Sequence, residues 1–186
     1  MKVAVFCGSG HGRLPVYAEQ AVRLGTLLAE SGAELVFGGG HVGLMGTIAD
    51  AVLNAGGKVT GVIPTALRDR EIAHPGLTSL FVVKDMHERK AKMSAIADAF
   101  VAMPGGAGTM EEIFEAWTWA MLGYHHKPCA FLNVNGYYDK LIDFIDHMVG
   151  ESFMRERYRD MLIIENDPEQ LLQSLRAYQP PASKWE

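Results

Sequence analysis

The sequence predicts an α/β fold in which a doubly wound, Rossmann-like parallel sheet carries helices on both faces. Short β-rich runs alternate with longer helical runs along almost the whole chain, which is typical of repeated strand–helix–strand units. Several short runs are apolar nearly throughout (VAVF, AFVAM and CAFLNV), as expected of strands that are buried on both faces. No internal repeat or linker divides the chain, so we expect one domain over residues 1–178 and a short tail at 179–186.

The expected elements interleave in a regular order. The strand candidates are residues 2–7, 34–37, 58–63, 80–83, 99–103, 129–134 and 161–164. The helix candidates are residues 16–31, 44–55, 86–97, 109–122, 137–150 and 168–178. Local end signals support three of these helices. Gly32 stands where a C′ glycine ends a helix, Asp85 stands at an N-cap position, and Pro168 lies in a first turn.

Bulk properties exclude several classes of function. A net charge of −5 over 186 residues argues against a nucleic-acid-binding protein, although a small phosphorylated ligand needs only a local site. No apolar run approaches the ~20 residues that a membrane span requires, and the N-terminal apolar run is too short for a signal peptide. Cys7 and Cys129 fit neither a zinc spacing nor a disulfide framework, and the seven histidines show no convincing ligand pairing. We therefore expect a cytoplasmic protein without a metal or cofactor.

Three glycine clusters directly follow predicted strands, at residues 8–12, 38–43 and 105–109. These positions are the carboxyl ends of parallel strands, where open α/β sheets bind ligands. The helix after each cluster directs free N–H groups and the positive end of its dipole at an anion, so we expect a phosphate there. For the first cluster, a purely conformational role of the glycines is an equally good explanation.

The second cluster matches the dinucleotide motif G-x-G-x-x-G through Gly38, Gly40 and Gly43. That motif also needs an acidic residue about 20 positions later, at the end of the next strand. Here the next strand ends in Val-Ile-Pro at residues 62–64, and the first acidic residue is Asp69. The sequence contains no G-x-x-x-x-G-K-[ST] motif either. NAD binding and P-loop chemistry are therefore disfavoured.

The third cluster brings a carboxylate close to the expected phosphate site. Thr109 is placed to cap the following helix, and Glu112 follows three residues later, so a T-x-x-E capping box is a plain structural explanation for both residues. Glu111 and Glu112 lie about 100° apart on a helix, so at most one of them should face a ligand directly.

At this point the sequence resembles a known family. Residues 104–112 match P-G-G-x-G-T-x-x-E, the signature of the LOG ("Lonely Guy") phosphoribohydrolases, which release cytokinin bases from riboside 5′-monophosphates and often also act on AMP. Nearly the whole chain to about residue 160 is similar to the family, in order and spacing. The further matching segments are FCGS (6–9), FGGG (37–40), GLMG (43–46), GVIP (61–64), MHERK (86–90) and LNVNGYY (132–138).

The resemblance implies an N-glycosidase that cleaves a nucleoside 5′-monophosphate, and it implies a homodimer whose active sites draw on both subunits. The catalytic pair of the family falls on Arg89 and Glu112. Ser9 and Gly40, in the first two glycine clusters, are further candidate substrate contacts. Ala107 stands where the family commonly has tyrosine, which affects one wall of the pocket. The substrate contacts that the family implies are Glu71, Lys90, Gly105, Gly106, Ala107, Gly108, Thr109, Glu111 and Thr118.

The residue types suit this chemistry. Cleavage of a ribosyl C1′–N bond builds positive charge on the sugar, and a carboxylate such as Glu112 stabilises that charge and activates water. Arg89 offers a permanently charged fork for the phosphate, the ribose or the departing base, although taken alone it would also fit a solvated helix arginine. The alternative is a non-catalytic carrier of a nucleotide or of molybdenum cofactor on the same fold. A lysine decarboxylase is disfavoured, because nothing marks a lysine for pyridoxal phosphate.

Overall fold

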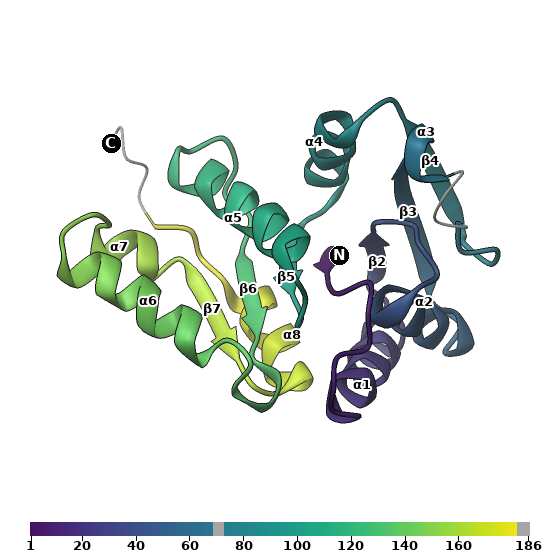
Figure 1. Cartoon of the computed structure of the whole chain (residues 1–186), viewed down its shortest axis with the longest axis horizontal. Coiled ribbons are helices and arrows are strands. Elements are labelled where there is room, and N and C mark those ends of the chain that lie inside the picture. Colours follow the sequence, from purple (N-terminus) through teal and green to yellow (C-terminus); the bar gives the residue numbers. More distant parts are fainter. Residues whose placement is uncertain (69–72, 182–186) are drawn as a thin grey trace.

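The fold is built on one parallel sheet with strand order β4-β3-β2-β1-β5-β6-β7 (Figure 1), so the predicted fold class is confirmed. A computed structural model describes residues 1–68 and 73–181 of the chain. All neighbouring strands pair in parallel, so helices connect them across the faces of the sheet. The strands are β1 (Lys2–Phe6), β2 (Glu34–Phe37), β3 (Lys58–Pro64), β4 (Ser79–Val83), β5 (Ala99–Ala102), β6 (Cys129–Leu132) and β7 (Leu162–Glu165).

The sheet separates two hydrophobic cores, and helices lie on both of its faces (Figure 1). Because side chains alternate along a strand, Val3 and Val5 of β1 enter one core while Ala4 and Phe6 enter the other. The first core is covered by α1 (Val16–Glu30), α2 (Gly43–Asn54) and α8 (Pro168–Ala177). The second is covered by α4 (Met86–Ile96), α5 (Ala107–Met121) and α6 (Asp139–Gly150). The short elements are α3 (Thr65–Arg68), η1 (Val134–Gly136) and α7 (Glu156–Arg159).

Three of the predicted helix ends are confirmed. Gly32 follows α1 with a φ of +70°, in the left-handed region that glycine tolerates. The carboxylate of Asp85 accepts a hydrogen bond from the backbone N–H of Glu88 at 2.9 Å and so caps α4. Pro168 occupies the first turn of α8 behind its N-cap, Asp167.

The structural alternative for Thr109 and Glu112, a capping box at the start of α5, does not hold. The helix begins at Ala107 with Gly106 as its N-cap, so Thr109 lies within the first turn instead of before it. Thr109 is buried against the glycine loop: a Cβ added to Gly105 would lie 2.1 Å from the Thr109 Oγ1. Gly105 therefore leaves the space that the Thr109 side chain occupies, and the side chain of Glu112 is not used in a cap.

The strand order gathers the three glycine clusters at one edge of the sheet. It reverses at β1, which lies between β2 and β5, so the loops after these three strands meet there. The N–H of Gly8 donates to the Pro104 carbonyl at 3.0 Å, and the N–H of Leu44 donates to the Gly8 carbonyl at 3.1 Å.

Among the described residues, no helix has the length and apolar character needed to cross a bilayer.

Candidate active site

A pocket of about 310 Å³ opens at this edge of the sheet, where the loop after β1 faces the starts of α4 and α5. Part of its wall is polar, from Arg89, Glu111 and Glu112, and part is apolar, from Met45 and Met86. The pocket therefore offers both a charged corner and an apolar surface to a ligand. Its lining residues are Cys7, Gly8, Ser9, Met45, Met86, Arg89, Gly106, Ala107, Gly108, Thr109, Glu111 and Glu112.

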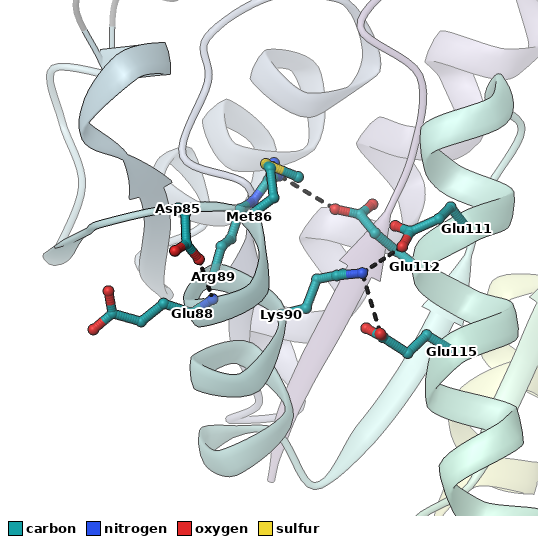
Figure 2. Close-up of polar contacts among 8 residues, drawn as sticks. All are labelled: Asp85, Met86, Glu88, Arg89, Lys90, Glu111, Glu112 and Glu115. Carbon is teal, nitrogen blue, oxygen red and sulfur yellow. Dashed lines mark hydrogen bonds and ion pairs between the residues drawn. The ribbon is translucent and has the colours of Figure 1, made fainter.

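Arg89 and Glu112 face each other across the gap between α4 and α5 (Figure 2). The Arg89 Nη2 lies 3.4 Å from the Glu112 Oε1, and only 11% of each side chain is exposed. A second guanidinium nitrogen, Nη1, lies 3.6 Å from the Met86 sulfur, a weak acceptor. Among the described residues, the buried Nε of Arg89 has no hydrogen-bond partner. The guanidinium is thus held in place, and it retains N–H groups that can donate hydrogen bonds to an oxygen atom of a ligand.

Gly38 makes room for the guanidinium. A Cβ added at this position would lie 2.0 Å from the Arg89 Nη2 and 3.1 Å from its Cζ, so the guanidinium occupies the space of a missing side chain. Gly38 directly follows β2, whereas Arg89 lies in the first turns of α4. The first glycine of the apparent dinucleotide motif therefore has a packing role: it lets an arginine from a distant helix approach the end of β2.

Burial and charge oppose each other at Glu112. Burial of the carboxyl raises the pKa of Glu112, while the positive charge of Arg89 lowers it, and the net pKa is above the ordinary value. The carboxyl therefore holds a proton more readily than an exposed glutamate does. Such a carboxylate suits general-base catalysis. Burial also raises the pKa of the neighbouring Cys7 thiol, with the charge of Glu112 adding to the effect, so Cys7 stays a neutral apolar wall.

Lys90 is bound to α5 and lies outside the lining of the pocket. Its Nζ pairs with the carboxylate of Glu111 and lies 3.1 Å from the Glu115 Oε1 (Figure 2). Burial would lower the pKa of Lys90, but the two hydrogen bonds outweigh it and raise the pKa. Lys90 thus ties α4 to α5 one residue away from the Arg89–Glu112 pair. Its predicted role as a substrate contact stays a prediction.

The start of α5 presents backbone donors to the pocket. The first N–H groups of a helix have no acceptor within it, and here Ala107, Gly108 and Thr109 occupy this first turn and line the pocket. Added Cβ atoms on Gly106 and Gly108 would meet no other atom within 4 Å, so the loop surface is open to a ligand. Together with the helix dipole, this is an arrangement that binds a phosphate.

The remaining predicted contacts are scattered. Ser9 is exposed and lines the pocket beside Gly106. Gly40 is buried, forms an isolated bridge with Ala73 and does not line the pocket. Thr118 is exposed and lines a different pocket. Glu71 lies outside the described residues. We expected at most one of Glu111 and Glu112 to face a ligand directly. Both side chains line the pocket, although only that of Glu112 is largely buried.

Sequence reasoning missed two residues of the pocket lining and one packing role. Cys7 and Met45 line the pocket, and Gly38 accommodates Arg89. Gly8 also lines the pocket, in keeping with its place in the first glycine cluster. For Cys7 the available signal was its position directly after β1. The role of Gly38 had no local signal, because its partner lies far along the chain.

Comparisons with known proteins agree with this geometry. A family model described as "Possible lysine decarboxylase" matches residues 45–175. The cytokinin riboside 5′-monophosphate phosphoribohydrolase of Rhodococcoides fascians is 48% identical over 94% of this chain and 89% of its own length. The enzyme of this name from Arabidopsis thaliana, LOG7, is 46% identical over 96% of this chain and 82% of its own. The chain belongs to the LOG family. As a member it is an N-glycosidase of the phosphoribohydrolase class.

Solved structures share the fold of this LOG family member at lower sequence identity. The molybdenum cofactor binding protein from Rippkaea orientalis superimposes with a TM-score of 0.71, at 20% identity and over 95% of both chains. That likeness shows the fold alone. In residues 1–68 and 73–181, no cluster of three or more His, Cys, Asp or Glu side chains is arranged to hold a metal ion.

Proposed function

We propose that this LOG family member hydrolyses the N-glycosidic bond of a purine nucleoside 5′-monophosphate, AMP or a cytokinin riboside 5′-monophosphate. The products would be the free base and ribose 5-phosphate. The observation that carries the proposal is the buried Arg89–Glu112 pair, which shares one pocket with the first turn of α5. The names of relatives at 46% and 48% identity support the same reaction.

The first turn of α5 would anchor the 5′-phosphate. Its free N–H groups and positive dipole end favour an anion, and the glycines at 106 and 108 leave the backbone accessible. Binding energy from this non-reacting phosphate would hold the ribose against the carboxylate of Glu112. A nucleoside without the phosphate should therefore react far more slowly.

Glu112 would act on the water that attacks the sugar. As the C1′–N bond breaks, its electron pair leaves with the base, and the carboxylate stabilises the positive charge that builds up on the ribose. The water oxygen then bonds to C1′, and Glu112 accepts one proton from that water. The same proton then passes from Glu112 to the departing base, so the carboxylate is regenerated and atoms and charges balance. Arg89 would keep the carboxylate ionised and oriented, in line with its lowering effect on the pKa of Glu112.

The base would rest on the apolar part of the pocket wall, which Met45 and Met86 supply. Ala107 gives this wall a smaller side chain than the tyrosine common in the family. The assay must therefore compare the turnover of substrates that carry adenine with the turnover of those that carry a bulkier N6-substituted base.

The test is to incubate the protein with AMP, with isopentenyladenosine 5′-monophosphate and with adenosine, and to measure free base and ribose 5-phosphate by chromatography. We expect both monophosphates to be cleaved and adenosine to be cleaved at least about 100-fold more slowly, since anchoring of this kind contributes several kcal/mol. Equal turnover of adenosine and AMP would contradict the phosphate anchor. No release of base from either monophosphate would refute the proposed reaction.

Replacing Glu112 with Gln preserves the shape of the side chain but removes its charge. We expect Glu112→Gln to bind AMP, as measured by calorimetry, and to release no base. The matched control is Glu115→Gln, one turn along the same helix and outside the pocket lining, which should keep most of the turnover. Unchanged activity of Glu112→Gln would refute the role given to this carboxylate.

A non-catalytic carrier of a nucleotide or of molybdenum cofactor is the second candidate, because the fold is shared with a molybdenum cofactor binding protein. A carrier has no use for a buried carboxylate beside a buried arginine, and this pair favours the enzyme. Binding of AMP by the wild-type protein without any turnover would favour the carrier instead.

We further propose a homodimer in which each site draws on both subunits. The support is the position of Thr118: it lies seven residues beyond Glu111 on α5, about 10 Å along the helix axis, in a pocket with the exposed Leu122 and Phe153. A second copy that covered these apolar side chains would also contact Thr118, which would then lie at the interface between the two subunits.

Complementation between two inactive variants tests this arrangement. Glu112→Gln subunits mixed with Thr118→Arg subunits should regain part of the activity if one site uses Glu112 of one copy and Thr118 of the other. Sedimentation should give a dimer for each protein alone. A sedimenting monomer, or no recovery in the mixture, would contradict the shared site.

A further inference from the structure

Tyr137 lies on the opposite side of the glycine loop from the candidate active site. Its hydroxyl donates a hydrogen bond to the carbonyl oxygen of Gly105 at 2.7 Å. The ring lines a second pocket of about 240 Å³, which shares Gly8, Ser9 and Gly106 with the first. Neither Gly105 nor Tyr137 lines the first pocket. The loop is therefore a thin wall between the two pockets, and Tyr137 binds it from behind.

The segment that carries Tyr137 is itself fixed. The Asn133 side chain accepts from the N–H of Tyr138 and donates to the carboxylate of Asp139, both at 2.7 Å. Asn135 has a φ of +52°, which turns the chain sharply just before the ring. The Tyr137 ring then packs edge-on against Tyr17 of α1, with ring centroids 5.8 Å apart. The hydroxyl is thus delivered to the loop by a rigid support.

The hydrogen bond determines how the peptide between Gly105 and Gly106 is oriented. This peptide is trans, so its carbonyl and its N–H point in opposite directions. Because the carbonyl points at Tyr137, the trans geometry directs the N–H of Gly106 away from Tyr137, and Gly106 also lines the first pocket. Glycines on both sides make this peptide easy to rotate, and an added Cβ at Gly106 would touch nothing within 4 Å.

We propose that Tyr137 is a positioning residue for phosphate binding, an inference that rests on the proposed function. Its hydroxyl holds the Gly105–Gly106 peptide so that the N–H of Gly106 adds to the donors of the α5 first turn. Tyr137 itself does not touch the substrate. Without the hydroxyl, the peptide rotates among several orientations and the phosphate loses one aligned donor.

The test is Tyr137→Phe, which removes the hydroxyl and keeps the ring. We expect the KM for AMP to rise about 10-fold, the size of effect of one hydrogen bond to a charged group, while kcat changes by less than about twofold. The dissociation constant of ribose 5-phosphate, measured by calorimetry, should rise by the same factor. The kcat/KM for adenosine should stay unchanged, because adenosine carries no phosphate.

Tyr17→Phe is the matched control, since it removes a hydroxyl from the same second pocket and leaves the Gly105 hydrogen bond in place. Its KM for AMP and its affinity for ribose 5-phosphate should equal those of the wild type, and thermal unfolding should show all three proteins folded. Wild-type affinities in Tyr137→Phe, or an equal loss with adenosine, would overturn the proposal. If the wild type binds ribose 5-phosphate but releases no base, the proposed reaction fails while the calorimetric comparison still decides the role of Tyr137.

Discussion

Gly38→Ala should disable the site without unfolding the protein. The added Cβ would lie 2.0 Å from the Arg89 Nη2, whereas carbon and nitrogen atoms in contact lie about 3.5 Å apart. The guanidinium must therefore retreat by about 1.5 Å. After the two guanidinium atoms of Arg89, the next nearest atom to the new methyl group is the Met45 sulfur, at an ordinary contact distance of 3.6 Å. The steric conflict thus falls on the end of one flexible side chain.

The expected loss of activity follows from this displacement. Glu112 lies 3.4 Å from the Arg89 Nη2, so a retreat of about 1.5 Å disrupts their pairing. Misplacement of a catalytic group by about 1 Å can cost about 100-fold in rate, and we expect kcat/KM for AMP to fall by about that factor. The free energy of unfolding should change by less than about 1 kcal/mol, because alanine also reduces the entropy of the unfolded chain.

The assay combines steady-state kinetics with urea unfolding, and Gly150→Ala is the control. An added Cβ at Gly150 meets no atom within 4 Å, so this variant should keep wild-type kinetics. The pH profile gives a third measurement. Once Arg89 has moved away, its lowering effect on the pKa of Glu112 weakens, and the acid limb of kcat/KM should shift to higher pH. Wild-type kinetics in Gly38→Ala would refute the claim that the position of Arg89 matters.

Three further predictions concern the same architecture. In the wild type, burial raises the pKa of Glu112, so kcat/KM should fall with decreasing pH through a value above the ordinary range of glutamate; an acid limb at or below that range would contradict this. Arg89→Lys keeps the charge but loses the planar fork, and kcat/KM should fall about 100-fold; a change of less than about threefold would show that charge alone suffices. Asp167→Ala removes the side chain that caps α8 and should lower the free energy of unfolding by about 1 kcal/mol, as measured by urea titration. Its kinetics should stay unchanged. Asp167→Asn, which can still cap the helix, should show a smaller loss of unfolding free energy.

The sequence alone determined the fold class and most of the elements. Apolar runs with flanking glycines predicted every strand to within two residues at each end, since burial on both faces of a parallel sheet leaves a local signature. The short elements α3 and α7 were not predicted, because a single helical turn has no periodicity to detect. The motif at residues 104–112 and its family resemblance supplied Arg89 and Glu112 together.

The tertiary structure decided which of these residues meet, because side chains far apart along the chain come together only through the strand order. It brings Arg89 against Gly38 and Glu112 and ties Lys90 to Glu111. Such contacts depend on how β2, β1 and β5 lie side by side, and that order is a property of the packed sheet. The start of α5 was likewise set by the folded chain. Local spacing allowed a capping box at Thr109, but the helix begins two residues earlier, at Ala107, and Thr109 packs into the space left by Gly105. The sequence specified the groups that the chemistry needs, and only packing set the distances at which they can act.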